Sequence, residues 1–260
     1  MEQLADIDTE MKATLPRHGT VITSVPKSGT YLLRSLLLAM PSLTPGPNLM
    51  EGIPPHMPAE ERPAVHARLL LTARSTDVSI THFQYSEKCI ETLAPLPHRR
   101  IFLIRDPRDF IVSYIDYVTD PESRHFHYEL LAPLADDHAR IAAMITGLPG
   151  RAGIRHLPGV RDYYMLFLGW LTDPDTYVVR YESLLQQDMR KEVFADIIKY
   201  LGLRADKETI DSAFRVGMNP ARAVTYRVGR AGRWRERFTD DLKELYREKT
   251  GDLNARCGYF

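Results

Sequence analysis

The chain has 260 residues, 44% hydrophobic and 26% charged, and its 34 lysines and arginines equal its 34 aspartates and glutamates. This length suits one sizeable α/β domain, and a net charge of zero argues against nucleic acid or an anionic membrane as the main partner. Cys89 and Cys257 form neither a metal-type spacing nor a disulfide framework, so we expect a reducing compartment.

Targeting signals are also missing from the pattern of apolar residues. No apolar run approaches the ~20 residues that a membrane-spanning helix needs. The N-terminal stretch MEQLADIDTEMKATLPRHG contains acidic residues and lacks the apolar centre of a signal peptide. We therefore expect a cytoplasmic protein without a membrane span.

Four short runs have the composition of β-strands, and helical patterns separate them. This alternation predicts an α/β fold, a single domain over residues 1–260 with a central parallel sheet flanked by helices. Ligands of such sheets bind beyond the carboxyl ends of the strands, and every run ends in polar residues. The runs are TVITSV (20–25), DVSITHF (77–83), RIFLIRD (100–106) and TYVVRYE (176–182).

Two stretches rich in proline and glycine, residues 44–63 and 146–159, are predicted to be long loops. Long loops inside a compact domain often act as lids or binding loops. They can equally be surface loops without a role in binding, and the sequence leaves both interpretations open.

The first strand runs into PKSGT and then into a leucine-rich helix, which is the layout of an anion site at a helix N-terminus. Gly29 allows close approach of the backbone to a ligand, Ser28 and Thr30 add hydroxyl donors, and Lys27 adds a mobile charge. The nucleotide-triphosphate loop GxxxxGK[ST] is absent, because here the lysine precedes the glycine. A helix start with a chance lysine is the alternative interpretation.

The third strand run leads into IRDPRDFIVSY. Asp106 can cap a helix that has Pro107 in its first turn, which leaves Arg105 at the strand end. Ser113 follows two helical turns beyond the cap, so Arg105 and Ser113 could converge on a second phosphate. In the alternative interpretation Arg105 pairs with Asp109, and Ser113 is a solvated helix residue.

The segment YRVGRAGRWRERFT (226–239) holds five arginines and two glycines. Arginine combined with glycine suits an ordered loop that closes over an anion. Trp234 and Phe238 favour burial, which argues against the alternative of a disordered basic tail.

Together these three segments resemble the sulfotransferases that use 3′-phosphoadenosine 5′-phosphosulfate (PAPS). VPKSGTYLL resembles the family's PKSGTTW loop, IRDPRDFIVSY its 3′-phosphate motif, and RVGRAGRWRERFT its C-terminal RKGxxGDWKNxFT loop. The order matches, and the segments span residues 21–239. The resemblance implies PAPS as co-substrate, PAP as product, and no metal.

The resemblance also assigns roles to single residues. The first loop would hold the 5′-phosphosulfate, with Lys27 neutralising the leaving oxygen, and a tyrosine in VVRYESLL would lie near the adenine. The family's catalytic histidine, in a KTH segment, corresponds to His82 in SITHF, and a histidine can remove a hydroxyl proton near neutral pH. A packed core histidine is the alternative. The implied cofactor-binding residues are Lys27, Ser28, Gly29, Thr30, Tyr31, Arg105, Ser113, Tyr181, Arg227 and Gly229, and the implied catalytic residues are His82 and Lys27.

The sequence departs from the family pattern at several of these positions. The adenine-stacking tryptophan of TTW is replaced, since the chain reads Thr30-Tyr31-Leu32. The lysine of KTH is Ile80 and the lysine of RKG is Val228. These departures leave open what stacks on the adenine and which cation replaces the missing lysine.

The expected reaction is in-line transfer of a sulfuryl group to a hydroxyl or amine of a small-molecule acceptor, for example a phenol, a lipid or a natural product. Aromatic residues could line the acceptor site or simply belong to the core. A nucleotide-dependent phosphotransferase and a non-catalytic module that binds PAP or another nucleotide remain alternative functions. The aromatic candidates are Phe83, Tyr117, Tyr128, Tyr163 and Tyr164, and the other histidines considered are His56, His125 and His127.

Overall fold

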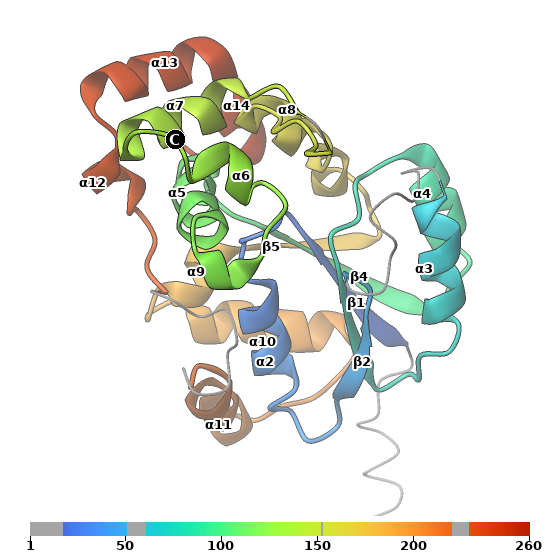
Figure 1. Cartoon of the computed structure of the whole chain (residues 1–260). Coiled ribbons are helices and arrows are strands. Elements are labelled where there is room, and N and C mark those ends of the chain that lie inside the picture. Colours follow the sequence, from blue (N-terminus) through green and yellow to red (C-terminus); the bar gives the residue numbers. More distant parts are fainter. Residues whose placement is uncertain (1–17, 51–60, 152, 220–228) are drawn as a thin grey trace, which may run out of the picture.

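A five-stranded parallel sheet with the strand order β2-β3-β1-β4-β5 forms the centre of the molecule (Figure 1). The structure is a computed structural model and describes residues 18–50, 61–151, 153–219 and 229–260. The four predicted strand runs are confirmed, each shifted by at most two residues. The strands are β1 (Gly19–Ser24), β2 (Thr44–Asn48), β3 (Asp77–Thr81), β4 (His98–Ile104) and β5 (Thr176–Arg180).

The central strand β1 marks the point where the strand order reverses. The chain passes from β1 through β2 to β3 on one side of β1, and then adds β4 and β5 on the other side. Ligands of open α/β sheets bind in the crevice beyond the carboxyl ends of the strands at such a point. The fold therefore directs attention to the segments that follow β1, β3 and β4.

The register of the strands brings those segments together. Thr23 of β1 is paired with Thr81 of β3 and with Phe102 of β4. The residue after Thr23 and the residue after Thr81, Ser24 and His82, consequently lie side by side where the two strands end.

Strand β2 corrects the prediction that residues 44–63 form a loop throughout. Its sequence TPGPN pairs only with β3, at the sheet edge, and the pairing is irregular between Pro45 and Asn48. Proline lacks the backbone N–H but is tolerated on an edge strand, where that side needs no partner. Residues 51–60 of the predicted loop, including His56, lie outside the described residues.

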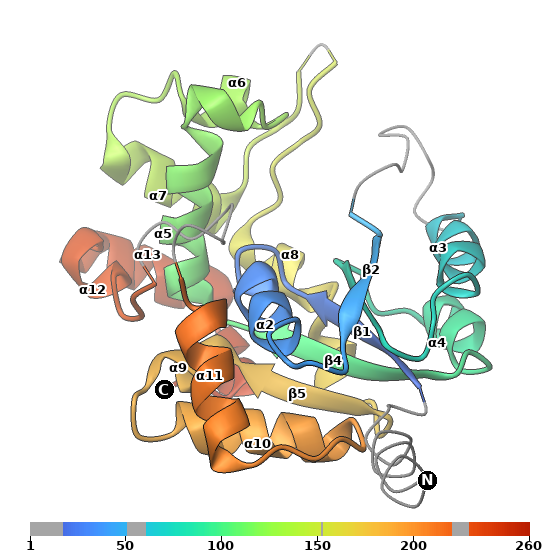
Figure 2. The ribbon, with the colours of Figure 1, turned by 90° about the horizontal axis from the view of Figure 1, so that it is seen from below.

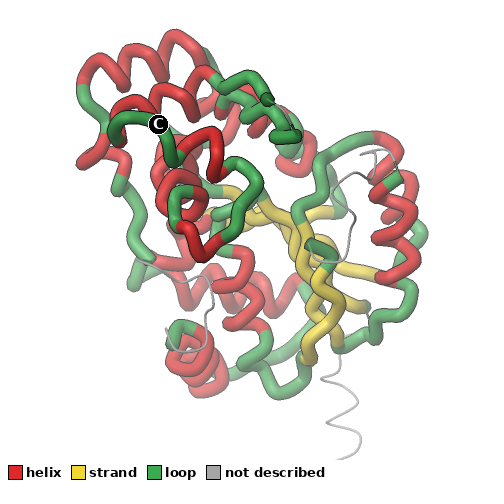
Figure 3. The backbone as a smooth tube through the Cα atoms, in the orientation of Figure 1, coloured by secondary structure: helices red, strands yellow, loops and turns green. Residues whose placement is uncertain are grey.

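Helices cover both faces of the sheet and bury one apolar cluster on each, as the secondary-structure view also shows (Figure 3). The smaller cluster joins β1, β3 and β4 to leucines of α2 (Thr30–Leu37) and to α10 and α11. The larger cluster, on the opposite face, centres on α5 (Pro107–Val118). Because helices cover both faces, every residue of β1 and β3 is buried, including their threonines and serines.

The remaining helices surround this core. Ser86, Asp136 and Asp206 accept hydrogen bonds from backbone N–H groups at the starts of α4, α7 and α11, as N-cap residues do. The α-helices not yet given are α3 (Arg62–Leu70), α4 (Glu87–Leu93), α6 (Tyr128–Leu131), α7 (Asp137–Thr146), α8 (Val160–Met165), α9 (Tyr181–Leu185), α10 (Arg190–Tyr200), α11 (Lys207–Gly217), α12 (Trp234–Arg237), α13 (Asp240–Thr250) and α14 (Leu253–Cys257), and the 3-10 helices are η1 (Pro121–Ser123) and η2 (Leu168–Leu171).

The predicted loop 146–159 folds back on itself. Leu148 pairs with Leu157, and Arg151 pairs with Ile154, in isolated antiparallel bridges. The segment extends from the body of the molecule as a narrow arm between α7 and α8 (Figure 2). Its possible action as a lid stays a prediction.

Candidate functional site

The loop between β1 and α2 has the backbone shape of an anion-binding turn. Lys27 has φ 65° and Gly29 has φ 93°, both in the left-handed region, and α2 begins directly at Thr30. A Cβ atom on Gly29 would lie 2.4 Å from Cδ2 of Tyr181, so only glycine lets the turn pass beneath this ring. The first N–H groups of α2 have no partner inside the helix and can receive an anion.

Two buried side-chain donors beside this loop lack an acceptor in the described part of the chain. They are the Ser28 hydroxyl, which is completely buried, and Nε of Arg105, whose residue is 5% exposed. A buried polar group without a partner costs about 1–3 kcal/mol. An anionic ligand at the loop would supply the missing acceptors, so the residues present fit a bound phosphate group.

Arg105 follows β4 and is held on several sides. Its guanidinium donates to the carbonyl oxygen of Lys27 at 3.2 Å and to that of Arg230 at 3.3 Å. Its Cζ lies 4.6 Å from the ring centroid of Tyr181. Arg105 therefore connects the loop after β1, the start of α9 and the C-terminal loop.

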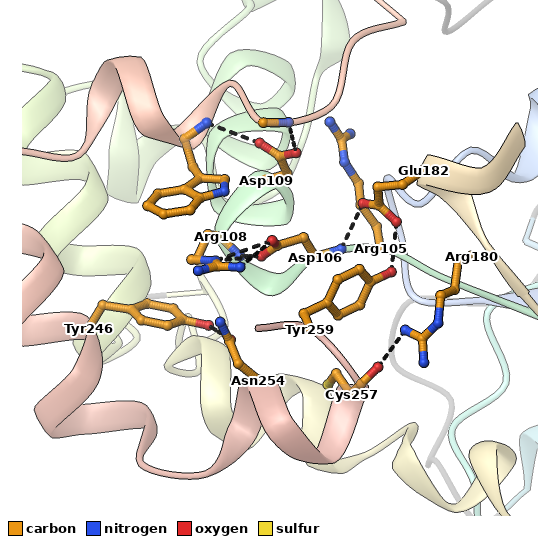
Figure 4. Close-up of polar contacts among 12 residues, drawn as sticks. Arg105, Asp106, Arg108, Asp109, Arg180, Glu182, Tyr246, Asn254, Cys257 and Tyr259 are labelled. Carbon is orange, nitrogen blue, oxygen red and sulfur yellow. Dashed lines mark hydrogen bonds and ion pairs between the residues drawn. The ribbon is translucent and has the colours of Figure 1, made fainter. Parts of the chain in front are cut away.

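The start of α5 fastens the C-terminal loop (Figure 4). Asp106 caps the helix through the N–H of Arg108 and binds the Arg108 guanidinium at 2.6 Å. Asp109 accepts hydrogen bonds from the backbone N–H groups of Gly232, at 2.5 Å, and Trp234, at 3.0 Å. The alternative pairing of Arg105 with Asp109 is therefore wrong, because the Asp109 carboxylate binds the backbone of the C-terminal loop instead.

Residues near the C-terminus also make hydrogen bonds next to the start of α5 (Figure 4). The Tyr259 hydroxyl donates to Glu182 at 2.7 Å, and Glu182 accepts the backbone N–H of Asp106 at 3.0 Å. Arg180 donates to the carbonyl oxygen of Cys257 at 2.6 Å. Burial raises the pKa of Glu182, and the hydrogen bonds from Asp106 and Tyr259 oppose this rise.

His82 lies directly after β3, at the end of the sheet that the sequence predicted. Its Nδ1 is 3.0 Å from the carbonyl oxygen of Ser24 and 3.0 Å from the Ser24 hydroxyl. Burial lowers the pKa of His82 to about 4, the bond to the Ser24 carbonyl opposes this, and the Lys27 ammonium lowers it further. The imidazole is therefore neutral at pH 7 and can accept a proton.

The Lys27 ammonium lies over an aromatic ring and affects two histidines electrostatically. Its Nζ is 3.9 Å from the ring centroid of Tyr117, on α5. His125 packs edge-on against the same ring, and its pKa is lowered to about 4 by burial, by His127 and by Lys27. The Lys27 charge thus lowers the pKa of both His82 and His125.

An aromatic pocket adjoins this group. Tyr114 donates to or accepts from Nδ1 of His127 at 2.8 Å and packs edge-on against His125. Phe110, Tyr114 and Tyr117 recur at helical spacing on α5, so they lead from the pocket towards Lys27. The pocket is lined by Phe110, Tyr114, His127, Met144, Leu157, Pro158 and Tyr163.

The structure brings together most of the predicted site residues. The loop after β1 contains Lys27, Ser28, Gly29 and Thr30, and both Arg105 and Tyr181 contact it. The remaining members are placed more loosely. Tyr31 packs against the smaller apolar cluster, Ser113 is partly buried on α5, Gly229 begins the described C-terminal loop, and Arg227 lies outside the described residues.

Other expectations were less accurate. Of the aromatic acceptor candidates, Phe83 and Tyr164 belong to the core, being 5% and 0% exposed, and the Tyr164 hydroxyl donates to the carbonyl oxygen of Arg105. Sequence reasoning missed Ser24 and Glu182. Ser24 is the last residue of β1, and Glu182 lies in the first turn of α9, two residues after β5. Their positions next to recognised motifs were the available signal.

Acidification is expected to destabilise the fold, because four histidines have a pKa lowered to about 4, chiefly by burial. In the unfolded chain histidine titrates near pH 6.5, so between pH 6.5 and 4 the unfolded state binds more protons and the free energy of unfolding falls as pH falls. Each histidine that stays neutral contributes a loss on the order of 1 kcal/mol by pH 5. These residues are His66, His82, His125 and His127.

Urea unfolding at pH 7.5, 6.5 and 5.5 measures this effect. The variant His66→Phe removes one of these four histidines, the one that packs against Phe83. It should reduce the pH dependence of the free energy of unfolding. A free energy of unfolding that stays constant over this range would contradict the expectation.

Membrane-spanning helices and metal-binding clusters are absent from the described ranges. None of their helices is long and apolar enough to cross a bilayer. No group of three or more His, Cys, Asp or Glu side chains within them is arranged to hold a metal ion.

Comparison by sequence finds no matching protein-family model and no matching curated protein. Comparison by structure finds similar solved structures, and three of them share 16–17% sequence identity with this chain. The mouse sulfotransferase SULT7A1 complexed with PAP has a TM-score of 0.65 and 16% identity, over 96% of this chain and 90% of that chain. Retinol dehydratase with androsterone and inactive cofactor PAP gives a TM-score of 0.57 at 17% identity, over 94% of this chain and 82% of that one. Its complex with retinol and PAP gives 0.56 at 16% identity, over 94% and 83%.

Proposed function

The chain has the sulfotransferase fold, and from this premise we propose that it is a PAPS-dependent sulfotransferase acting on a small-molecule acceptor. The observation that carries the proposal is the pair of buried donors without acceptors, the Ser28 hydroxyl and Nε of Arg105, beside the turn that precedes α2. Such donors suit a ligand with phosphate groups. The similar structures that were solved with PAP support the same ligand.

In the proposed complex the loop 26–30 holds the 5′-phosphosulfate through backbone N–H groups and the hydroxyls of Ser28 and Thr30. Arg105 holds the 3′-phosphate, together with Ser113, Gly229 and Arg227. Tyr181, whose ring covers Gly29, contacts the nucleotide and takes over part of the role of the missing tryptophan. The carbonyl contacts of Arg105 leave its buried Nε for the ligand.

PAPS supplies an activated sulfuryl group, which passes to the acceptor oxygen as the sulfur–oxygen bond to the 5′-phosphate breaks. His82 accepts the hydroxyl proton, which its neutral imidazole allows at pH 7. Lys27 and the loop N–H groups stabilise the negative charge that develops on the departing phosphate; preorganised donors of this kind supply ~3–4 kcal/mol each. Because a sulfuryl group carries less charge than a phosphoryl group, the proposed reaction needs no metal.

The acceptor is proposed to approach along the aromatic face of α5. Tyr117 is the half-buried member of this face and contacts the Lys27 ammonium, whereas Phe110 and Tyr114 are buried in the core. An apolar lining with few polar groups suits a neutral phenol, lipid or other apolar alcohol. The retinol dehydratase structures, which hold androsterone and retinol, support an acceptor of this class.

We further propose that the protein acts in the cytoplasm.

Thermal unfolding with PAP tests the nucleotide. PAP at ~100 times its Kd should stabilise the protein by roughly 2.7 kcal/mol and raise Tm accordingly, because it occupies the donors around Ser28 and Arg105. ATP with magnesium and ADP with magnesium serve as controls and should leave Tm nearly unchanged.

The outcomes separate the alternatives. A shift with ATP–magnesium and none with PAP would contradict the proposal in favour of a phosphotransferase. A shift with PAP, followed by the absence of PAP release from PAPS with every phenolic and aliphatic alcohol tried, would favour a non-catalytic PAP-binding module.

A further inference from the structure

A single buried hydroxyl connects the loop after β1 to the histidine after β3. Ser24 is the last residue of β1, and its side chain is completely buried. Its Oγ lies 2.6 Å from Oγ1 of Thr30 and 3.0 Å from Nδ1 of His82. Thr30 begins α2 and belongs to the anion-binding loop. Ser24 therefore touches both the loop and the proposed base.

The hydroxyl proton of Ser24 has two possible acceptors, and they exclude each other. If Ser24 donates to Nδ1 of His82, the ring proton must be on Nε2, and Nε2 cannot accept a proton from an acceptor hydroxyl. If Ser24 donates to Thr30, Nδ1 is free to carry the ring proton and Nε2 has the lone pair that a base needs. A histidine's tautomer is set by the bond that its other nitrogen makes.

The Ser24 carbonyl favours the second arrangement. The carbonyl oxygen lies 3.0 Å from Nδ1 of His82 and can only accept a hydrogen bond. A protonated Nδ1 donates to this oxygen, whereas the lone pair of an unprotonated Nδ1 is repelled by it. The Thr30 hydroxyl decides between the two states. Without an anion Thr30 can donate to Ser24, which drives the Ser24 proton towards His82. When Thr30 donates to a phosphate oxygen, its own oxygen accepts from Ser24.

We propose that Ser24 is a positioning residue that couples occupation of the phosphate loop to the tautomer of His82, so that nucleotide binding creates the base. This inference rests on the proposed function, because it assumes that the loop holds a phosphate group and that His82 accepts the proton. The bound 5′-phosphate orders one chain of donors, from Thr30 to the phosphate, from Ser24 to Thr30, and from Nδ1 of His82 to the Ser24 oxygens. Nε2 is then left to face the acceptor.

The test measures the tautomer of His82 directly. Protein labelled with ¹⁵N only in histidine is recorded by two-bond ¹H–¹⁵N correlation at pH 7.5, with and without saturating PAP, and the His82→Gln spectrum identifies the signal. In the unsubstituted protein, PAP should turn a mixture of tautomers into one in which the Nδ1–H form exceeds the other by about fivefold, the ratio expected from one buried hydrogen bond.

Two variants break the connection between Thr30, Ser24 and His82 at different hydroxyls and should give opposite results. Ser24→Ala leaves the backbone carbonyl as the partner of Nδ1, so the Nδ1–H form should dominate with and without PAP. Thr30→Val removes the other acceptor of Ser24, so the Nε2–H form should dominate in both conditions. Ser79→Ala is the matched control, because Ser79 on β3 is also completely buried and its hydroxyl has no hydrogen-bond partner in the described residues; it should behave like the unsubstituted protein.

Failure of the coupling can be told apart from failure of the proposed function. If PAP raises Tm but the His82 tautomer ratio stays the same, the coupling through Ser24 is wrong while the nucleotide site stands. The same holds if Ser24→Ala and Thr30→Val both respond to PAP like the unsubstituted protein. If PAP raises Tm in neither the unsubstituted protein nor the Ser79→Ala control, the proposed function fails and the coupling fails with it.

Discussion

The variant His82→Ala is expected to lower kcat for sulfation by about 10²–10⁴-fold, which is the usual contribution of general acid–base catalysis. The reason is the position of the ring after β3, at the end of the sheet beside the loop, where Nδ1 contacts the Ser24 carbonyl and hydroxyl. PAP affinity should change little, because the donors that surround the loop belong to other residues. The measurement is the rate of PAP release from PAPS with an acceptor found by screening, together with the Kd for PAP.

A matched control for this variant is His138→Ala. His138 is exposed and pairs with Asp241 at 2.6 Å on the surface between α7 and α13, so its removal should leave kcat unchanged. Melting curves confirm that both variants are folded at the assay temperature. Unchanged turnover in His82→Ala would rule out His82 as the base and would make His125 the next candidate, because it packs against the Tyr117 ring that Lys27 contacts.

The variant Arg105→Ala should instead weaken nucleotide binding, with the Kd for PAP rising by about 100-fold. Such a change corresponds to 2.7 kcal/mol, and hydrogen bonds to charged groups contribute ~1.5–3 kcal/mol. The guanidinium is 5% exposed and holds the Lys27 and Arg230 carbonyls in place, so its loss also loosens the loop. Isothermal titration with PAP measures the change.

The control for charge is Arg99→Ala, on the strand β4 that precedes Arg105. Arg99 is exposed and packs over the Tyr200 ring at the opposite end of β4, so its removal subtracts the same charge without touching the site. Its Kd for PAP should stay within about threefold of the original value, a difference well below 1 kcal/mol. A large loss of kcat in Arg105→Ala with unchanged PAP affinity would contradict the binding role.

Local sequence determined the parts of this protein that depend on neighbouring residues. Short runs rich in β-branched and aromatic residues, separated by helical patterns, predicted β1, β3, β4 and β5. The turn with Lys27 and Gly29 was predicted because a strand, a glycine turn and a helix start lie next to each other in the chain. The cap at Asp106 followed from the Asp-Pro pair in the same way.

Only the tertiary structure decided the contacts between distant segments. Strand β2 escaped prediction because TPGPN has no strand propensity and is held by pairing with β3. Asp109 binds the backbone of Gly232 and Trp234, more than 100 residues further along the chain, although its sequence neighbourhood suggested Arg105. Proximity in the chain gives no information about such partners, because they depend on how the helices pack.

The same distinction applies to the site itself. The sequence by itself identified Lys27 and Arg105 as candidates, since each follows a strand whose carboxyl end must meet the others at one edge of a parallel sheet. His82, at another strand end, was identified by the resemblance of SITHF to the KTH segment of the sulfotransferases. The sequence did not reveal Ser24 or Glu182, whose importance comes from the register that brings Ser24 beside His82 and from the packing of Tyr259 against Glu182. Periodicity and turn chemistry are encoded locally, whereas the partner of a buried polar group is chosen only when the sheet and its helices close around it.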